Sequence, residues 1–260
     1  SSTLSIYQLN TCAVASGATI VASATTICSG QTASLTVSSQ PGVNYQWLLN
    51  GQALSGATST SFSATTAGTY KVAVQNNALG CADTSIQVAI VVNPLPNVTV
   101  GLSGPTTFCQ GQSVTLTAPT ANSYLWSNGS TAQTISIGAS GTYALTATST
   151  GCSATSTATV VTVNALPTII INGTDASGTT VNDNTICVGG SATLTASGGV
   201  SYLWNTSETV ASITKTPVTT TSYTVTGTNA NGCENTATQV ITVNALPVAT
   251  VANQVMCEGD

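Results

Sequence analysis

Histidine is absent from this sequence and charge is scarce: only 3% of its 260 residues are Asp, Glu, Lys or Arg, against roughly 25% in ordinary soluble domains. The two basic residues are Lys71 and Lys215, whereas nucleic-acid affinity rests on several Lys or Arg contacts to phosphates. We therefore exclude nucleic acid as a partner. Solubility must come from Ser, Thr and Asn side chains, which suits an outer surface better than a cytosol.

The same absences argue against catalysis. An enzyme needs a base, a nucleophile or a metal in a cleft, and Ser and Thr hydroxyls are poor nucleophiles without an activating base. The seven carboxylates are spread over the chain. We expect a non-enzymatic protein with no catalytic residues and no cofactor.

Long apolar runs are lacking too. No stretch approaches the ~18 to 20 consecutive apolar residues of a membrane helix. The opening SSTLSIYQLNTC has neither the basic start nor the apolar middle of a signal peptide. We expect no membrane span and interpret the chain as a mature or excised soluble segment.

Cysteine, in contrast, occurs eight times, without the close Cys-x-x-Cys pairs or the histidines of a structural zinc site. Such cysteines are typical of disulfides in an oxidising, extracellular compartment. Free buried thiols, which behave as small apolar side chains, are the alternative. The predicted disulfide residues are Cys12, Cys28, Cys81, Cys109, Cys152, Cys187, Cys233 and Cys257.

Three tryptophans mark a repeated unit. Trp47, Trp126 and Trp204 stand in YQWLLNG, YLWSNG and YLWNTS, 79 and 78 residues apart, and so regular a period indicates tandem copies. Upstream of each Trp is a Cys-x-Gly followed by an alternating segment, as in CQGQSVTLTA. Downstream are a segment such as GTYKVAV, a turn ending in Gly-Cys and a last alternating segment.

Alternating apolar and polar residues predict half-buried strands. In SVTLTA, for example, Val114, Leu116 and Ala118 fall on one face. Six or seven short strands in ~70 to 80 residues, with turns rich in Asn and Gly, describe an antiparallel β-sandwich. No segment is typical of a helix, so we predict an all-β chain.

The order of landmarks resembles immunoglobulin-like and PKD-like repeats: a Gly-x-Ser-Val-Thr-Leu strand, then Tyr-x-Trp, then Gly-Thr-Tyr. With the Cys-x-Gly start, the Gly-Cys turn and the Asn-Pro/Ala-Leu-Pro joint, the chain is similar to repeats of secreted surface proteins and adhesins of Bacteroidota, substrates of the type nine secretion system. The resemblance implies tandem immunoglobulin-like sandwiches, extracellular localisation at the cell surface and a role in adhesion.

The cores should form around the tryptophans. In antibody-type domains the second cysteine lies two residues after the Tyr of the penultimate strand, but here the interval is 9 to 11 residues. We therefore expect no disulfide across the core, and tryptophans packed against aliphatic residues instead. The expected core residues are Trp47, Trp126, Trp204, Tyr70, Tyr143 and Tyr223, with Leu35, Leu116 and Leu194.

A proline joint separates the units. VNPLPNVTV at 92–100 returns as VNALPTIII at 163–171 and as VNALPVATV at 243–251. Proline fixes φ and lacks an N–H, so it ends strand pairing and stiffens a short connection. We expect a rod of domains over 18–96, 97–167 and 168–247, after an N-terminal segment 1–17 and before 248–260, the start of a fourth repeat or an orphan strand.

Two disulfide patterns fit the repeat. In the topology that the resemblance implies, Cys-x-Gly and the last hairpin lie at opposite ends of a domain, about 15 to 20 Å apart, whereas a disulfide needs Cα atoms within ~7 Å. We favour a ladder across the joints: Cys12 with Cys81, Cys28 with Cys152 and Cys109 with Cys233, which leaves Cys187 and Cys257 for further domains. The alternative lies within domains: Cys28 with Cys81, Cys109 with Cys152 and Cys187 with Cys233.

The densest group of acidic residues lies in NGTDASGTTVNDN, residues 172–184. Asp175 and Asp183 are weak candidates for calcium, a cation that takes six to eight oxygen ligands. We favour a solvated loop instead, because Gly, Asn, Asp and Ser are ordinary loop formers.

Two functions compete. The first is a structural stalk or filament segment, whose partners are neighbouring repeats or further copies of itself. The second is a module that binds a glycan or a host protein through exposed loops, where recognition residues concentrate. Aromatic residues are only 5% of the chain and stand mostly at repeated scaffold positions, which favours the first. Whether the chain is part of a longer protein or a polymerising subunit stays open.

Overall fold

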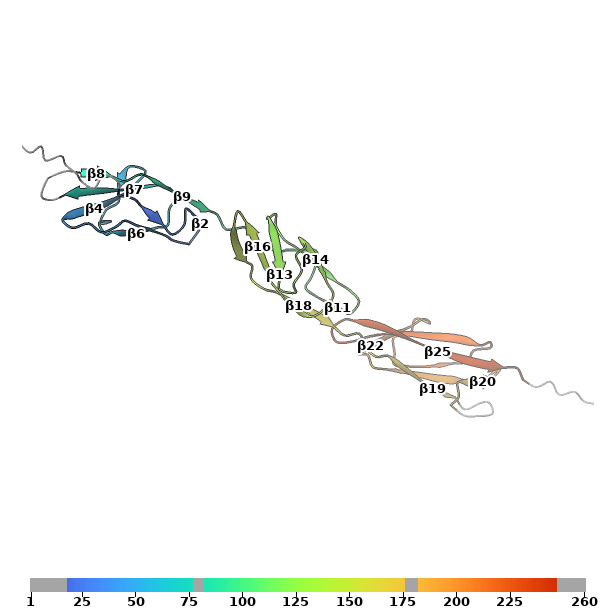
Figure 1. Cartoon of the computed structure of the whole chain (residues 1–260). Coiled ribbons are helices and arrows are strands. Elements are labelled where there is room, and N and C mark those ends of the chain that lie inside the picture. The colour runs from blue at the N-terminus through green and yellow to red at the C-terminus, as the bar shows by residue number, and fades with distance from the viewer. Residues whose placement is uncertain (1–17, 77–81, 176–181, 247–260) are drawn as a thin grey trace, which may run out of the picture. The chain divides into compact units, whose positions relative to one another are not determined.

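The computed structural model describes residues 18–76, 82–175 and 182–246, and every structural statement below concerns these residues. All their regular elements are β-strands, as predicted (Figure 1). Accordingly, this part of the chain offers no helix of the length and apolarity that crossing a membrane requires.

The first repeat forms two sheets. One has the strand order β1-β3-β6, and the other has the order β2-β9-β7-β4-β5 with β8 also paired to β7. The strands are β1 (Val21–Ala22), β2 (Thr26–Cys28), β3 (Ala33–Thr36), β4 (Val43–Leu49), β5 (Gln52–Ala53), β6 (Ser61–Ala64), β7 (Gly68–Asn76), β8 (Ala82–Thr84) and β9 (Val88–Asn93).

The second repeat is cut into shorter pieces. Its sheets have the orders β10-β12-β14, β11-β18-β15 and β13-β16-β17. The strands are β10 (Gly101–Leu102), β11 (Thr107–Cys109), β12 (Val114–Thr117), β13 (Ser123–Trp126), β14 (Thr134–Ile137), β15 (Gly141–Tyr143), β16 (Leu145–Ser149), β17 (Cys152–Thr155) and β18 (Thr159–Asn164).

The third repeat again has two sheets, with the orders β19-β21-β23 and β20-β25-β24-β22. The strands are β19 (Ile170–Asp175), β20 (Thr185–Cys187), β21 (Ala192–Ser197), β22 (Ser201–Trp204), β23 (Ser212–Lys215), β24 (Thr221–Thr228) and β25 (Glu234–Asn244).

Two kinds of pairing recur in all three repeats. The longer neighbours are antiparallel, as in β4 with β7, β13 with β16 and β22 with β24. A three-residue strand that ends in cysteine instead runs parallel to the last strand of its repeat: β2 with β9, β11 with β18 and β20 with β25. The chain therefore has the tandem immunoglobulin-like β-sandwich fold that the resemblance implied, and these parallel pairs are an addition to the predicted antiparallel scheme.

The outer faces of the sheets are joined by hydroxyl groups rather than by charges. Facing Thr and Ser side chains on adjacent strands lie 2.7 to 3.0 Å apart, within hydrogen-bond distance. Such cross-strand pairs stabilise a sheet by about 0.2 to 1 kcal/mol each. The pairs are Thr146 with Thr155, Thr148 with Ser153, Thr193 with Thr214, Thr195 with Ser212 and Thr224 with Thr238.

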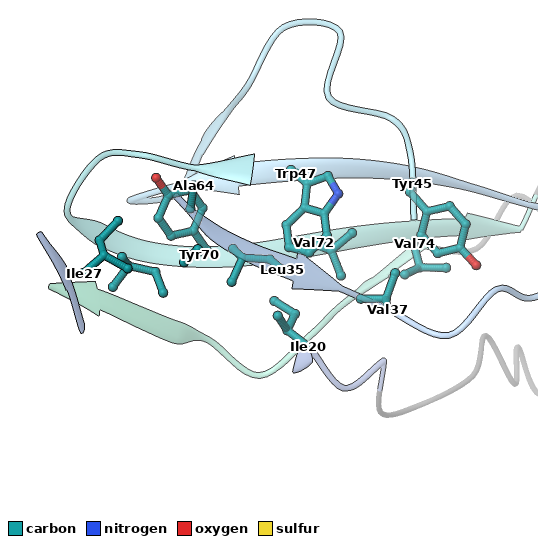
Figure 2. Close-up of a cluster of buried hydrophobic side chains, with 12 residues drawn as sticks. Ile20, Ile27, Leu35, Val37, Tyr45, Trp47, Ala64, Tyr70, Val72 and Val74 are labelled. Atoms are coloured by element: carbon teal, nitrogen blue, oxygen red, sulfur yellow. The ribbon is translucent and has the colours of Figure 1, made fainter. Parts of the chain in front are cut away.

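Each tryptophan is buried, as predicted, together with the leucine of the preceding strand. Figure 2 shows the first core, with Trp47 beside Leu35 and Val72. Trp47 packs against aliphatic residues as expected, and it also contacts an aromatic one, because the rings of Trp47 and Phe62 have centroids 5.8 Å apart. The third core is closer to the expectation, with Trp204 among Leu194, Ile213, Val225 and Ile241.

The indole nitrogens satisfy their hydrogen bonds in the same way in all three repeats. The Nε1–H of Trp47 donates to the Ser59 carbonyl at 2.9 Å, that of Trp126 to Ala132 at 2.8 Å and that of Trp204 to Val210 at 2.9 Å. Each acceptor lies in the segment that follows the tryptophan strand. A buried indole N–H without a partner would be costly, so this bond fixes how the segment folds back over the core.

The predicted tyrosines behave less uniformly. Tyr70 is buried, its hydroxyl donates to the Thr66 carbonyl at 2.8 Å, and burial raises its pKa; this is the tyrosine corner of immunoglobulin-like domains. Tyr223 is buried as well. Tyr143 is only half-buried, which corrects its prediction as a core residue. The cause is a break at Ala144: β7 runs on past Tyr70, whereas Tyr143 ends β15.

The described chain divides into two compact units, and the division runs through the second repeat. One unit holds residues up to 103 with 115–135 and 142–159, and the other holds 104–114, 136–141 and the residues from 160 on. The sheets, in contrast, follow the repeats. The domain boundaries derived from the sequence stay a prediction.

The third core predicts a stability difference between two leucines of that repeat. Leu194 is fully buried beside Trp204, and Leu203 is 53% exposed. Leu194→Ala should lower the free energy of unfolding of the third repeat by about 2 to 5 kcal/mol, and Leu203→Ala by about 0.5 kcal/mol or less. Hydrogen exchange of the β24 and β25 amides measures both, and equal effects would contradict this core.

Candidate functional site

The parallel strand pairs place a cysteine at the end of each repeat. In register, Cys28 lies opposite Asn93, Cys109 opposite Asn164 and Cys187 opposite Asn244. The Asn is the last residue of its strand in each case. Each Cys-x-Gly therefore stands beside the point at which the chain leaves the repeat.

The turn after each cysteine has the same hydrogen bonds. The amide after Cys28 donates to the Asn93 carbonyl at 2.8 Å, and the amide after Cys109 donates to Asn164 at 2.8 Å. The glycines of these turns, Gly30 and Gly111, have φ of 86° and 92°, which explains why glycine stands there. The turn thus fixes the backbone that carries the cysteine.

The partner cysteines stand in the last hairpin of the following repeat. Between β16 and β17, Thr150 and Gly151 have φ of 49° and 80°, and Ser149 pairs directly with Cys152. Positive φ at both central residues is the type I′ turn of two-residue hairpins. The third repeat has a longer loop before Cys233, closed by a hydrogen bond from the Asn229 amide to the Cys233 carbonyl.

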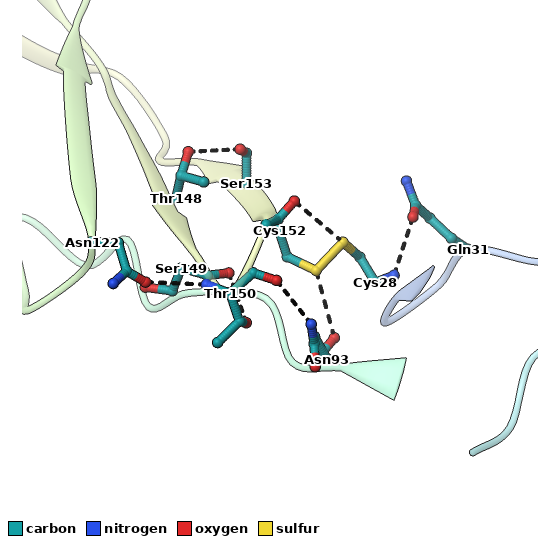
Figure 3. Close-up of a disulfide and its surroundings, with 10 residues drawn as sticks. Cys28, Gln31, Asn93, Asn122, Thr148, Ser149, Thr150, Cys152 and Ser153 are labelled. Atoms are coloured by element: carbon teal, nitrogen blue, oxygen red, sulfur yellow. Dashed lines mark hydrogen bonds between the residues drawn. A yellow bond between two sulfur atoms is a disulfide. The ribbon is translucent and has the colours of Figure 1, made fainter. Parts of the chain in front are cut away.

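Two disulfides join these elements. Cys28 is bonded to Cys152 (Figure 3) and Cys109 to Cys233, each with Cα atoms 5.6 Å apart and a sequence separation of 124 residues. These two bonds confirm two of the three bonds of the predicted ladder and rule out, for these four cysteines, the pattern within domains. Cys12, Cys81 and Cys257 lie outside the described residues, and Cys187 is a free cysteine.

The bonded cysteines differ in exposure. Cys152 and Cys233 are buried, whereas Cys28 and Cys109 are half-buried. The Cys152 sulfur lies 4.0 Å from the Asn93 carbonyl oxygen, and the Cys233 sulfur lies 3.9 Å from that of Asn164. A disulfide sulfur has no hydrogen to donate, so we interpret these distances as contacts. The hairpin cysteine therefore inserts against the end of the preceding repeat.

Asparagine side chains add hydrogen bonds at both joints. At the first joint, the Asn93 Nδ2 donates to the Thr150 carbonyl at 2.8 Å (Figure 3). At the second, Asn229 donates to Ala165 and Asn235 to Pro167, both at 2.9 Å. None of these residues was predicted from the sequence. The Val-Asn before each joint was a signal for Asn93, but nothing in the sequence distinguishes Asn229 or Asn235 from the many other asparagines.

The proline joints have the predicted effect on pairing. Between the end of β9 at Asn93 and the start of β10 at Gly101, and between Asn164 and Ile170, the chain forms no strand. At these places the prolines remove the N–H groups that a ladder would need. Each disulfide, with its asparagine hydrogen bonds, bridges one such gap.

The two acidic residues predicted as calcium candidates lie in different environments. Asp183 accepts a hydrogen bond from the Thr185 amide at 2.9 Å, which is a local turn. Asp175, the last residue of β19, is buried and its Oδ2 accepts from the Asn184 amide at 3.0 Å, so the expectation of a solvated loop is wrong for Asp175. Neither Asp175 Oδ1 nor Asn184 Oδ1 accepts a hydrogen bond from any residue that the structure describes.

Calcium binding by Asp175 and Asp183 stays a prediction. In residues 18–76, 82–175 and 182–246, no three His, Cys, Asp or Glu residues gather as a metal site would require.

The third repeat also carries an ion pair between Lys215 on β23 and Glu208. The hydrogen bond from Lys215, followed by one from Thr206, lowers the pKa of Glu208 from 4.5 to about 2. A carboxyl with a depressed pKa stabilises the folded state above its ordinary pKa and loses that contribution as the pH falls toward 2. This pair ties the loop after Trp204 to a neighbouring strand and is separate from the joints.

Residues 16–94 match a family model described as "Ig-like domain CHU_C associated". The first repeat is an immunoglobulin-like domain. No curated protein matches the chain.

Solved structures resemble larger parts of the chain. The I-band fragment I67–I69 of titin is 14% identical over 88% of this chain and 97% of its own, with a TM-score of 0.44. The three N-terminal domains of the Hoc capsid protein of bacteriophage RB49 are 16% identical over 89% and 99%, with a TM-score of 0.32. A Ca²⁺-stabilised adhesin with which an Antarctic bacterium binds ice is 16% identical over 90% and 75%, with a TM-score of 0.37. At these scores the likenesses carry no argument about function.

The second disulfide is testable with trypsin, because the only cleavage sites follow Lys71 and Lys215. In the unfolded, unreduced protein, the fragment from residue 216 on should stay attached through Cys109–Cys233. Cys109→Ser should release it without reductant, as mass spectrometry would show. Cys187→Ser, the control, should not. A fragment still attached in the Cys109→Ser protein would mean that Cys233 has another partner.

Proposed function

We propose that this chain is a non-enzymatic structural segment of an extracellular protein, a stalk or filament part at the cell surface that serves adhesion. The observation that supports it is the pair of equivalent disulfides, each from the end of one repeat to the last hairpin of the next. Disulfides persist in oxidising, extracellular compartments. The resemblance to secreted surface proteins of Bacteroidota belongs to the same proposal.

The position of the bonds supports a mechanical role. A bond inside a sandwich would stabilise one domain, whereas these bonds cross the proline joints, where no strand pairing holds the chain. The bonds limit bending of each joint and shorten the length of chain that is released when a repeat unfolds. That behaviour is useful in a protein that holds something away from the cell under tension.

Because the two disulfide loops overlap, the unfolded length gained when both bonds are lost is not the sum of the two single gains. With both bonds intact, the shortest covalent path from Cys28 to Cys233 runs through the 43 residues from Cys152 back to Cys109, about 150 Å when extended. If either bond is lost, this path has 81 residues and is about 280 Å long. If both are lost, it has 205 residues and is about 700 Å long.

We therefore predict unequal gains in single-molecule pulling. Cys152→Ser should add about 130 Å to the unfolded length, and Cys152→Ser with Cys109→Ser about 550 Å. Cys12 and Cys81 are replaced by serine in every protein compared, so that only the described bonds act. Cys187→Ser is the control and should add nothing. Two equal, additive increments would contradict the overlapping pairing.

The cellular role is tested by shortening the protein in its source organism. In-frame removal of residues 97–167 deletes one repeat with its joint and leaves Cys28 before the hairpin of Cys233. Gold labelling of intact cells in the electron microscope should detect both forms outside, the shorter one closer to the surface. Labelling that requires lysis would contradict an extracellular role. Tight glycan binding by the purified protein, lost on replacement of third-repeat loop residues, would favour the binding module.

A further inference from the structure

The end of the third repeat has the same architecture as the two ends that carry disulfides. β20 pairs with β25 in the register of the other parallel pairs and sets Cys187 opposite Asn244. The Val188 amide donates to the Asn244 carbonyl at 3.0 Å, as Ser29 and Gln110 donate to Asn93 and Asn164. The backbone that presents Cys28 and Cys109 to a partner is therefore already formed around Cys187.

The turn after Cys187 is equivalent as well. Gly189 has φ of 87°, close to Gly30 and Gly111. The Gly190 amide donates to the Cys187 carbonyl at 2.8 Å, as Gln31 and Gln112 do to Cys28 and Cys109 at 2.9 and 3.1 Å. One difference is that Gly190 replaces the glutamine whose side chain accepts from the amides of Cys28 and Cys109. That bond lies within the turn, so its absence leaves the presentation of Cys187 unchanged.

Two exposed apolar residues lie near this free cysteine in the strand pairing: one follows Cys187, and the other is two residues beyond Asn244, which pairs with Cys187. Val188 is 40% exposed and Leu246 is 60% exposed. The equivalent of Leu246 at the second joint is Leu166, which lines a cavity with Gly232 of the docked hairpin and is 37% exposed. The equivalent at the first joint is Leu95, which is 48% exposed. The sequence of the joint is also the same, since Val-Asn-Ala-Leu-Pro occurs at 163–167 and at 243–247.

We propose that this end of the third repeat is a docking surface for the last hairpin of a further repeat of the same kind, and that Cys187 forms a disulfide with the cysteine that follows glycine in that hairpin. The inference builds on the proposed function, which supplies the oxidising compartment. Its partner is defined by chemistry: a turn with glycine at positive φ, then a cysteine that is buried once docked, as Cys152 and Cys233 are.

A second copy of the same end fits this surface less well. At both known joints one side is a half-buried cysteine on a strand end and the other is a hairpin with a buried cysteine. The contact is thus between unlike surfaces, and a symmetric pair through Cys187 would bring together two strand ends without a hairpin.

The bond forms by thiol–disulfide exchange with an oxidant that is itself a disulfide, such as oxidised glutathione or a disulfide oxidoreductase. The Cys187 thiolate attacks one sulfur of the oxidant and releases the other as a thiolate. The hairpin thiolate then attacks the Cys187 sulfur in the mixed disulfide and releases the second thiolate. Two protein thiols lose two protons and two electrons in total, and the oxidant is reduced to two thiols.

The experiment adds a fourth repeat, whose last hairpin can form a disulfide with Cys187. Residues 248–260 are replaced by a copy of residues 97–164, so that the added repeat follows Pro247 and carries counterparts of Cys109 and Cys152. Both this protein and the original 260-residue chain are oxidised with glutathione, alkylated with iodoacetamide without reduction and mapped by mass spectrometry. The Cys28–Cys152 and Cys109–Cys233 peptides serve as internal controls for folding.

In the lengthened protein we expect the free thiol to be on the added repeat and not at Cys187. Alkylation at Cys187 should fall by about tenfold or more, because the added hairpin is present at a high effective concentration. The Cys187 peptide should be found joined to the Cys152-type peptide, and the label should appear on the Cys109-type peptide. Cys152→Ser in the added copy alone is the matched control and should return the label to Cys187.

Two results would overturn the inference. One is full alkylation of Cys187 in the lengthened protein with both internal bonds intact, and the other is a Cys187 peptide joined to Cys187 of a second molecule. Neither result would contradict the proposed structural role, which the pulling and cell-surface experiments test on other bonds.

Discussion

The parallel pairing of a three-residue strand with the last strand of its own repeat is the constraint on which the rest depends. It sets Cys28 opposite Asn93 and Cys109 opposite Asn164, so a cysteine early in the sequence of a repeat lies at the exit of that repeat. Without this pairing the two residues could be far apart, since 65 residues separate Cys28 from Asn93. With this pairing, a cysteine lies beside each joint, and the hairpin of the next repeat supplies the second cysteine of the disulfide.

The second repeat takes part in both bonds. Its Cys152 reaches back to the first repeat and its Cys109 reaches forward to the third. The two loops of 124 residues overlap along the second repeat, so neither bond can be treated as an independent crosslink. In the unfolded chain such long closed loops remove much conformational freedom, which is the main way in which a disulfide favours the folded state.

The shortage of charge has a structural counterpart. Where other proteins place charged residues on exposed strands, this chain places Thr and Ser, which hydrogen-bond across neighbouring strands. The Lys215–Glu208 pair adds an electrostatic contact in the third repeat. A surface held by neutral hydroxyls changes little with salt or pH, because neutral groups are neither screened nor titrated.

The sequence by itself determined the all-β fold, the repeat and the buried tryptophans, because alternation and period depend on local spacing that any sandwich must obey. It also indicated the ladder of disulfides, once the resemblance supplied a topology, but left a pattern within domains open. Tertiary structure decided between them, because only the register of the parallel strands places Cys28 and Cys109 at the joints. It also decided what spacing could not show: that Tyr143 is half-exposed where its strand breaks, that Asp175 is buried, and that Asn229 and Asn235 donate to the joint, since these depend on contacts between residues far apart in the chain.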